Sequence, residues 1–302
     1  MAINTSQIQQ LLRPGLSAAF GDFAMYPAQW PEIFDTYESD KNQEIESEQK
    51  FLGLGQIRPE GAPTAVDTMG QRIVTTYVHR YVGLSFVITR MALLDNLYKS
   101  KFPHMVKSLK RSLAQTKEIL AASVLNNAFD AAFPLGDGQP LCSLNHPIDG
   151  GVVANTPVVQ SDLTEAALEA AVITIQQFRD QAGLIIHTKP KKMIVPTAGQ
   201  FVAERLLGSA FRVDTNVNTI SAIYNTQVVP EGYRVNQFLT PLQPNAWFLL
   251  TDSPDSFKHF IREKVETDVY TEQSTDNLIA KAVERYSFGV SNFRGVYGSN
   301  GP

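Results

Sequence analysis

The chain has 302 residues and a mass of 33.4 kDa, which allows one large domain or two small ones. Its 43% hydrophobic and 19% charged residues exclude a wholly disordered protein, and no apolar run is long enough to predict a membrane span. A single cysteine, Cys142, excludes an internal disulfide framework, and the net charge of -4 gives no global attraction to nucleic acid. The first residues carry no secretory signal, so an intracellular product is expected.

Residues 1–35 mix glycine, proline and aromatic side chains without a sustained period. The aromatic residues are Phe20, Phe23, Tyr26 and Trp30. Because such side chains are unfavourable in water, the segment is predicted to be an ordered arm. The arm lies either on its own domain or on a neighbouring subunit, and the sequence leaves both alternatives open.

Residues 36–82 are predicted to form a long flap that buries little of itself. The segment starts with an acidic run over 38–48, continues with glycine and proline, and ends with the strand signal Ile73 to Val78. An isolated two-stranded flap is only marginally stable, so this one is expected to rest on another surface. The acidic run fits either a solvated face of the flap or carboxylate ligands for a divalent cation.

Residues 102–133 give the clearest helical signal, with apolar side chains at helical spacing. The glycines and proline that follow are expected to end the helix. The first half is basic, through Lys99, Lys101, Lys107, Lys110, Arg111 and Lys117. These cations fit either a sequence-independent contact with phosphate or the solvated face of an amphipathic helix.

The second half of the chain mixes helix and strand. A turn-rich insert over 134–160 precedes a helix that is expected to start at Ser161 or Asp162 and to end at Gly183. Strands are predicted at 193–196, 227–229 and 247–250, and a shorter helix capped by Thr197 runs to residue 208. Two long strands over 257–269 and 278–290 close the chain, so the fold class is α+β.

No motif for catalysis, nucleotide binding or metal binding is present, so no enzyme activity, cofactor or metal is expected. Cys142 and His146 lie four residues apart, but no third residue is available to orient the histidine as a base. His146 is therefore expected to hydrogen-bond the backbone of an Asn-His-Pro turn. An enzyme that uses Cys142 or the acidic run stays as an alternative, and loss of turnover in Cys142→Ala would support it.

Several strings resemble major capsid proteins of tailed bacteriophages with the HK97-type fold, closest to the Mu-like major head subunit group. They are Tyr-Val-Gly-Leu-Ser-Phe-Val-Ile-Thr at 81–89, Gln-Pro-Leu-Cys-Ser-Leu-Asn-His-Pro at 139–147 with Gly150-Gly151 and Asn155-Thr156 behind it, residues 214–219, Glu-Arg-Tyr-Ser-Phe-Gly at 284–289 and Phe-Arg-Gly-Val-Tyr-Gly-Ser at 293–299. The likeness covers about residues 30–300, and the order of the strings adds to its weight.

The resemblance implies a division of the chain. Residues 1–35 would be the N-terminal arm, 36–82 the extended loop (E-loop), 83–160 the peripheral domain with a spine helix at about 102–133, 161–245 the axial domain, and 246–302 the closing strands of the peripheral domain. It also implies a major capsid protein that forms hexamers and pentamers of an icosahedral shell around double-stranded DNA. A shell protein of a bacterial nanocompartment is the alternative.

The implied partners are further copies of the chain, a scaffolding protein, a portal, a decoration protein and packaged double-stranded DNA, with no membrane. The implied location is the virion capsid, assembled in the cytoplasm of the host bacterium. Residues that we expect at contacts between subunits are Trp30, Glu44, Glu46, Glu48, Lys50, Phe51, Arg58 and Arg72. Residues that we expect to face the lumen and its DNA are Lys99, Lys107, Lys110 and Arg111.

Overall fold

Two long antiparallel strands form the centre of the larger sheet. The computed structural model describes residues 27–95, 102–211, 220–239 and 245–301. In the order β1-β10-β11-β4, β1 runs parallel to β10, whereas β10 with β11 and β11 with β4 are antiparallel. The strands are β1 (Asp35–Glu38), β4 (Arg80–Ile88), β10 (Phe257–Thr271) and β11 (Leu278–Val290). The two long closing strands predicted from period two are confirmed.

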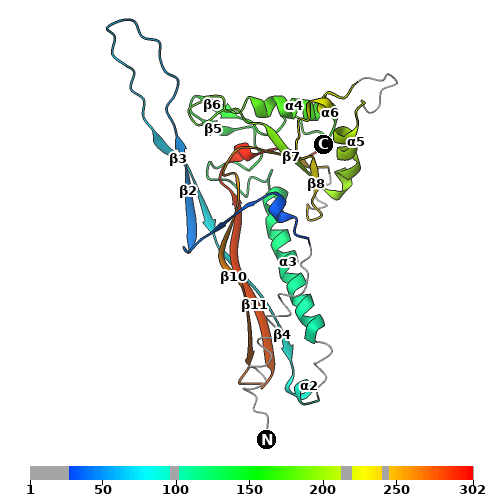
Figure 1. Ribbon diagram of the computed structural model, residues 1–302. Helices are drawn as coiled ribbons and strands as arrows, with labels where there is room; N and C mark the ends of the chain where they lie inside the picture. The colour runs from blue at the N-terminus through cyan, green and yellow to red at the C-terminus, as the bar shows by residue number, and fades with distance from the viewer. Residues whose placement is uncertain (1–26, 96–101, 212–219, 240–244, 302) are drawn as a thin grey trace.

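A long helix, α3 (Phe102–Asn126), lies along this sheet (Figure 1). Its apolar stripe packs on small side chains of β11, with Leu109 and Leu113 against Ala282. The helix ends seven residues before the predicted Phe133, because the carbonyl of Ala128 accepts a hydrogen bond from the N–H of Cys142 in the insert (2.7 Å). The short helix α2 (Arg90–Leu94) precedes α3. Among the described helices, none is both long and apolar enough to cross a bilayer.

The second sheet has the strand order β12-β9-β7-β8 and packs against helix α4 (Glu165–Gln176). Its strands are β7 (Pro190–Val195), β8 (Tyr233–Val235), β9 (Trp247–Thr251) and β12 (Val296–Ser299). The helix α4 begins later than predicted, because Thr164 is the residue whose side chain accepts a hydrogen bond from the N–H of Ala167. It also ends earlier, and Gly183 serves a later turn with a φ of 83°.

Three short elements lie beside the second sheet: η2 (Thr197–Gly199), α5 (Gln200–Gly208) and α6 (Ala222–Thr226). Thr197 begins η2 and does not cap α5, whose N-cap residue is Gly199. The strand predicted at 227–229 is wrong. Gln227 has a left-handed φ of 45° that closes α6, and the chain enters a strand only at β8. The predicted loop over 214–219 lies outside the described residues.

The predicted flap is present as β2 (Gln43–Lys50) paired antiparallel with β3 (Gly70–Val78). Pairing runs from Gln43 with Val78 to Lys50 with Gly70, and residues 51–69 beyond it form neither helix nor strand. Figure 1 shows this end of the flap directed away from the rest of the chain. We call residues 51–69 the flap tip and the paired strands β2 and β3 the flap root.

The insert and the closing segment pack on each other. The insert contains the small hairpin β5 (His146–Ile148) and β6 (Gly151–Val153), and the closing segment contains η3 (Phe293–Gly295) before β12. Gly298 of β12 permits this contact, because a Cβ there would lie 2.8 Å from both the Cys142 Sγ and the Phe248 ring. A further turn, η1 (Trp30–Glu32), connects the N-terminal part to β1.

Candidate assembly interface

The flap root turns a charged face inward, onto the chain's own body. Alternate residues of a strand point to opposite sides, so Glu44, Glu46, Glu48 and Lys50 share one side of β2. This side is half-buried, whereas the residues between them are exposed. Glu44 begins the row, where it accepts a hydrogen bond from Ser39 (2.8 Å). The other three reach groups far away in the sequence.

Glu46 binds the larger sheet. The Lys258 ammonium of β10 lies 2.6 Å from the Glu46 carboxylate, and the Ser291 hydroxyl donates to the same carboxylate. Burial alone would lower the pKa of Lys258, but hydrogen bonds to Glu46 and Asp255 outweigh it and raise the pKa above its ordinary value. Lys258 is buried, so this pair ties the middle of β2 to a fixed point of the body.

Glu48 binds the closing segment through Arg294, one of the largest fully buried side chains. The guanidinium donates to the Glu48 carboxylate (2.7 Å) and to the backbone carbonyl of Arg179 (2.5 Å), and it lies over the Phe293 ring. Gln181 donates to the second carboxylate oxygen (2.8 Å). Burial lowers the pKa of Arg294, and the Glu48 charge opposes that shift. The burial of Arg294 therefore depends on Glu48 as its anionic partner.

Lys50 and Arg72, one on each strand of the root, share Asp149 in the turn between β5 and β6. The Asp149 oxygens lie 2.5 Å from the Lys50 ammonium and 2.8 Å from the Arg72 guanidinium. The hydrogen bond from Lys50, ahead of the charge of Arg72, lowers the pKa of Asp149. These contacts hold the flap at the last strand pair before its tip begins.

Part of the acidic run packs on the body of the chain, whereas Glu38 and Asp40 are exposed, as the prediction of a solvated face expects. Its inward glutamates are paired with basic and hydroxyl groups of the body, so the predicted solvated face is wrong for Glu46 and Glu48. Within the described part of the chain, no group of three or more histidine, cysteine, aspartate or glutamate side chains is arranged to hold a metal ion.

The flap tip exposes apolar side chains. Leu54 is 82% exposed and Ile57 fully so. Phe51, Leu52, Val66 and Met69 are also exposed large hydrophobic residues of this segment. Arg58 donates to the carbonyl of Ala62 inside the tip (2.8 Å). Of the predicted contact residues, Phe51 and Arg58 therefore lie where another molecule can reach them, whereas Glu46, Glu48, Lys50 and Arg72 have partners in their own chain.

The part of the arm that the structure describes lies on its own chain. Glu118 of α3 is buried and accepts hydrogen bonds from the N–H groups of Gln29 (2.7 Å) and Trp30 (3.1 Å). The Trp30 ring packs on His259, with 4.4 Å between ring centres. Lys192 of β7 then binds the Glu32 carboxylate (2.8 Å). The predicted contact residue Trp30 thus has intramolecular partners, and residues 1–26 lie outside the described residues.

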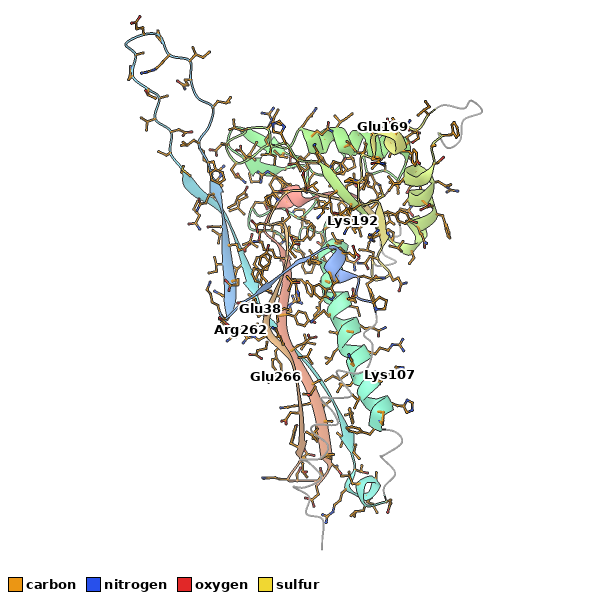
Figure 2. The ribbon with its side chains drawn as sticks, viewed as in Figure 1. Glu38, Lys107, Glu169, Lys192, Arg262 and Glu266 are labelled. Carbon is orange, nitrogen blue, oxygen red and sulfur yellow. The ribbon has the colours of Figure 1, made fainter. Side chains whose placement is uncertain are left out.

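Of the predicted DNA-facing residues, Lys107, Lys110 and Arg111 lie in the first half of α3, and Figure 2 labels Lys107 there. Lys107 and Arg111 are exposed and Lys110 is half-buried. Lys99 lies outside the described residues. The three described residues therefore lie on one element, α3.

The only cysteine has the environment of a structural residue. Cys142 is buried, and desolvation raises the pKa of its thiol well above the ordinary value, which disfavours the nucleophilic thiolate. His146 is fully buried and stacks on Phe293, with 3.8 Å between ring centres. Its ring nitrogens face Asp137 (2.6 Å) and Asn155 (3.2 Å), so the predicted backbone partner is wrong and its partners are side chains.

Asn155 joins the insert to the closing segment by hydrogen bonds. Its side-chain amide donates to the carbonyls of Leu141 (2.7 Å), Phe293 (3.1 Å) and Val296 (3.2 Å), and its oxygen accepts from the N–H of Ser143 (2.8 Å). It is fully buried. Asn155 and Arg294 stand in the strings quoted from the sequence, but no local pattern indicates their partners. Asp149 and Lys258 were missed, since no local pattern marks them.

Comparison with known proteins agrees with this architecture. The sequence matches the model of the family described as "Phage capsid protein" over residues 72–299. One similar solved structure is a virus-like particle from Pyrococcus furiosus, with 9% identity and a TM-score of 0.54 over 97% of this chain and 99% of that chain. Another is Mycobacterium phage Che8, with 11% identity and a TM-score of 0.56 over 91% of this chain and 93% of that chain. A third is the procapsid of bacteriophage JBD30, with 13% identity and a TM-score of 0.53 over 98% of this chain and 76% of that chain. A search of curated proteins found no match.

The α+β arrangement of flap, long helix and closing hairpin is the HK97-type capsid fold, as the solved structures bear out. The chain belongs to the phage capsid protein family, because the family model covers well over half of its length. It is a major capsid protein, and the nanocompartment alternative is not favoured. Membership of a structural capsid family indicates a role other than catalysis and a place in the virion shell.

Proposed function

We propose that copies of this chain assemble into hexamers and pentamers, which close an icosahedral shell around double-stranded DNA. The exposed flap tip carries this proposal. Its apolar side chains are exposed among the residues that the structure describes, and exposed apolar surface marks an interaction site. Repeating one such contact around a rotation axis gives closed rings. Capsid and procapsid assemblies among the similar structures support it.

The proposal extends to the parts and partners of the shell. The spine helix and the long strands form a peripheral domain, and residues of about 161–245 form an axial domain at the centre of each ring. Lys107, Lys110 and Arg111 face the lumen and meet DNA phosphate through charge alone. A scaffolding protein, a portal and a decoration protein join the shell, and assembly takes place in the host cytoplasm. Among capsid proteins, the chain belongs with the Mu-like major head subunit group.

The experiment removes the tip and keeps the root. Deleting all of 42–70 would also remove Glu46 and Glu48, the partners of Lys258 and Arg294, and a failure to assemble could then be a failure to fold. Replacing 51–69 by Asn-Gly instead closes the hairpin at the pair of Lys50 and Gly70 with a favoured two-residue turn. We expect a folded subunit that forms no closed particles by electron microscopy, whereas the unaltered chain forms them.

Two results would count against the proposal. Particles of normal size and number from the shortened chain would show that the tip is dispensable. An unaltered chain that stays monomeric with and without its scaffolding protein would refute the assembly function itself. Circular dichroism and a cooperative denaturant transition of the shortened chain are the control for folding.

A further inference from the structure

The second strand of the flap root joins the body at a hinge of one residue. The strand β3 pairs with β2 as far as Val78, and the pairing of β4 with β11 begins at Arg80. His79 between them is buried, and its ring nitrogens lie 3.1 Å from the Ser39 hydroxyl and 3.0 Å from the Ser287 hydroxyl. The base of the flap is therefore held at this point, and the direction of the flap depends on what supports β3 beyond it.

Two glycines of the body support β3, and neither leaves space for a larger side chain. A Cβ on Gly136, in the insert, would lie 2.4 Å from the backbone oxygen of Val74. A Cβ on Gly289, in β11, would lie 2.6 Å from the Tyr77 ring. Tyr77 is buried and its hydroxyl hydrogen-bonds the Ser291 hydroxyl, so the ring is not free to swing aside. We call the contacts of Gly136 and Gly289 with β3 the flap seat.

The insert side of the flap seat is rigid. Gly136 lies in a turn in which the N–H of Leu135 donates to the carbonyl of Gln139 (2.7 Å). The carboxylate of Asp137, the next residue, is paired with the fully buried His146 (2.6 Å). Because this turn is held in a close-packed part of the body, a side chain added at Gly136 should displace β3 and not the turn.

The size of the displacement follows from the position of the hinge. Ordinary van der Waals contact begins at 3.4 Å, so a Cβ that would lie at 2.4 Å requires β3 to move by about 1 Å at Val74. Val74 is five residues from His79, about 16 Å along an extended strand, so the rotation is about 3–4°. The same rotation moves Gly70, nine residues from the hinge, by about 2 Å, and it moves the flap tip further.

The direction of the flap matters for assembly, because in the proposed shell the flap tip makes the contact between copies. A contact whose rotation closes gives a ring of definite size, and one whose rotation does not close gives an open assembly. We propose that Gly136 and Gly289 are positioning residues that set the angle of the flap and, through it, the curvature of the shell. This inference rests on the proposed assembly function and adds to it the residues that determine its geometry.

The test compares Gly136→Ala and Gly289→Ala with two control variants of the full chain. Gly70→Ala, at the start of β3, adds a Cβ that meets nothing within 4 Å. Gly298→Ala crowds the core, because its Cβ would lie 2.8 Å from the Cys142 Sγ, but it meets no residue of the flap. The second control therefore reproduces a loss of stability without pressure on β3.

Two measurements are made on each variant. Spin labels on Ile57→Cys, paired in turn with Val158→Cys and Ile119→Cys, report distances from the flap tip to the body of the unassembled subunit; all three positions are exposed, whereas Cys142 is buried. Electron microscopy gives the size and shape of the particles. We expect both seat variants to change a mean label distance by at least about 2 Å and to form shells of altered diameter, open sheets or tubes. Both controls should match the unaltered chain.

A second-site change tests the direct contact. Tyr77→Val removes the ring atoms that the added Cβ of Gly289→Ala meets, so the double variant should return the label distances toward those of the unaltered chain. If Gly136→Ala does not fold, Gly289→Ala and this double variant carry the test. A double variant that keeps the displaced distances would contradict the seat.

The outcomes separate the inference from the function. Unchanged label distances in the seat variants overturn the positioning role of the glycines. Changed distances with shells of ordinary diameter overturn the link from flap angle to curvature. Altered particles from Gly298→Ala reduce the effect to lost stability and overturn the inference as well. If the unaltered chain forms no particles, the assembly function fails, and the label distances still decide whether the glycines set the flap angle.

Discussion

Removing Glu48 should release the flap root from the body. Arg294 is 1% exposed, and Glu48 is its anionic partner. In Glu48→Ala, the guanidinium keeps its backbone acceptor on Arg179 but loses its countercharge. A buried charge without a partner is costly, so hydration of Arg294 should lower the free energy of the variant. The easiest path is detachment of β2.

The size of the effect follows from this burial. Breaking a buried ion pair by removing one partner costs about 3–5 kcal/mol. If detachment of the root relieves that cost, amide hydrogens of β2 should exchange faster by about two to four orders of magnitude, since 1.36 kcal/mol corresponds to a factor of ten. In Arg294→Met the cost should be smaller, because the Glu48 side chain left behind is already 21% exposed and can be hydrated.

Hydrogen exchange with mass spectrometry on unassembled subunits measures the effect. The matched control is Ile45→Ala, on the outward side of the same strand, where the side chain is 57% exposed and little should change. Faster exchange confined to β2 and β3 is the expected pattern. Equal exchange in Glu48→Ala and the unaltered chain would refute the idea that this ion pair holds the root.

Other predictions concern the core, the insert and the arm. Leu125→Ala should lower the free energy of unfolding in urea by about 2–5 kcal/mol, because Leu125 is fully buried; an effect below 1 kcal/mol would contradict its place in the core. Asn155→Ala should cost about 3 kcal/mol or more, because several buried backbone groups lose their partner; an unchanged melting temperature would contradict that role. Hydrogen bonding to Lys192 lowers the pKa of Glu32, and hydrogen bonds to Glu32 and Glu231 outweigh burial and raise the pKa of Lys192. The stabilisation by Glu32 is therefore fully present at a pH above its ordinary pKa of 4.5, and it is lost as the pH falls through the lowered pKa. The stabilisation by Lys192 is fully present at a pH below its ordinary pKa of 10.5, and it is lost as the pH rises through the raised pKa. Denaturation over a pH series of Lys192→Met should lose the dependence that comes from Lys192 and weaken the one that comes from Glu32, which keeps Arg234 as a partner at 3.3 Å; unchanged slopes would refute the pairing. Cys142 should react with a maleimide only after unfolding, and rapid labelling of the native subunit would show that it is not buried.

Local pattern predicts the elements of this fold well. Period two over 257–290 indicates the long hairpin, and helical period indicates the helix on which it packs. The pattern fails where a distant segment decides the outcome. Residues 128–133 contain three alanines and continue the helical signal, yet the chain turns there because the insert offers a hydrogen bond to Ala128.

The flap root shows the same limit in the candidate interface. Alternating glutamates predict that one side of β2 is acidic, but an acidic strand face in a polar run is usually solvated. The partners that bury this side lie 212 residues away for Glu46 and 246 residues away for Glu48. No spacing rule links positions so far apart, so the sequence identifies the strand and its sides but not the surface that receives it.

The division of the flap into a held root and an exposed tip has a consequence for assembly. Fixing the backbone of one residue costs about 1–2 kcal/mol of conformational entropy. The eight residues of β2 are already fixed on their own subunit, so their backbone loses no further conformational entropy when two copies associate. In the proposed contact, the tip is the part of the flap that a neighbour would order. A modest apolar contact would then suffice for association, as expected when one binding element is organised in advance. If the root were loose, as in the expected behaviour of Glu48→Ala, assembly should require a higher subunit concentration even though no residue at the contact has changed. A light-scattering titration of that variant against Ile45→Ala measures this directly, and equal critical concentrations would show that advance ordering of the root contributes nothing.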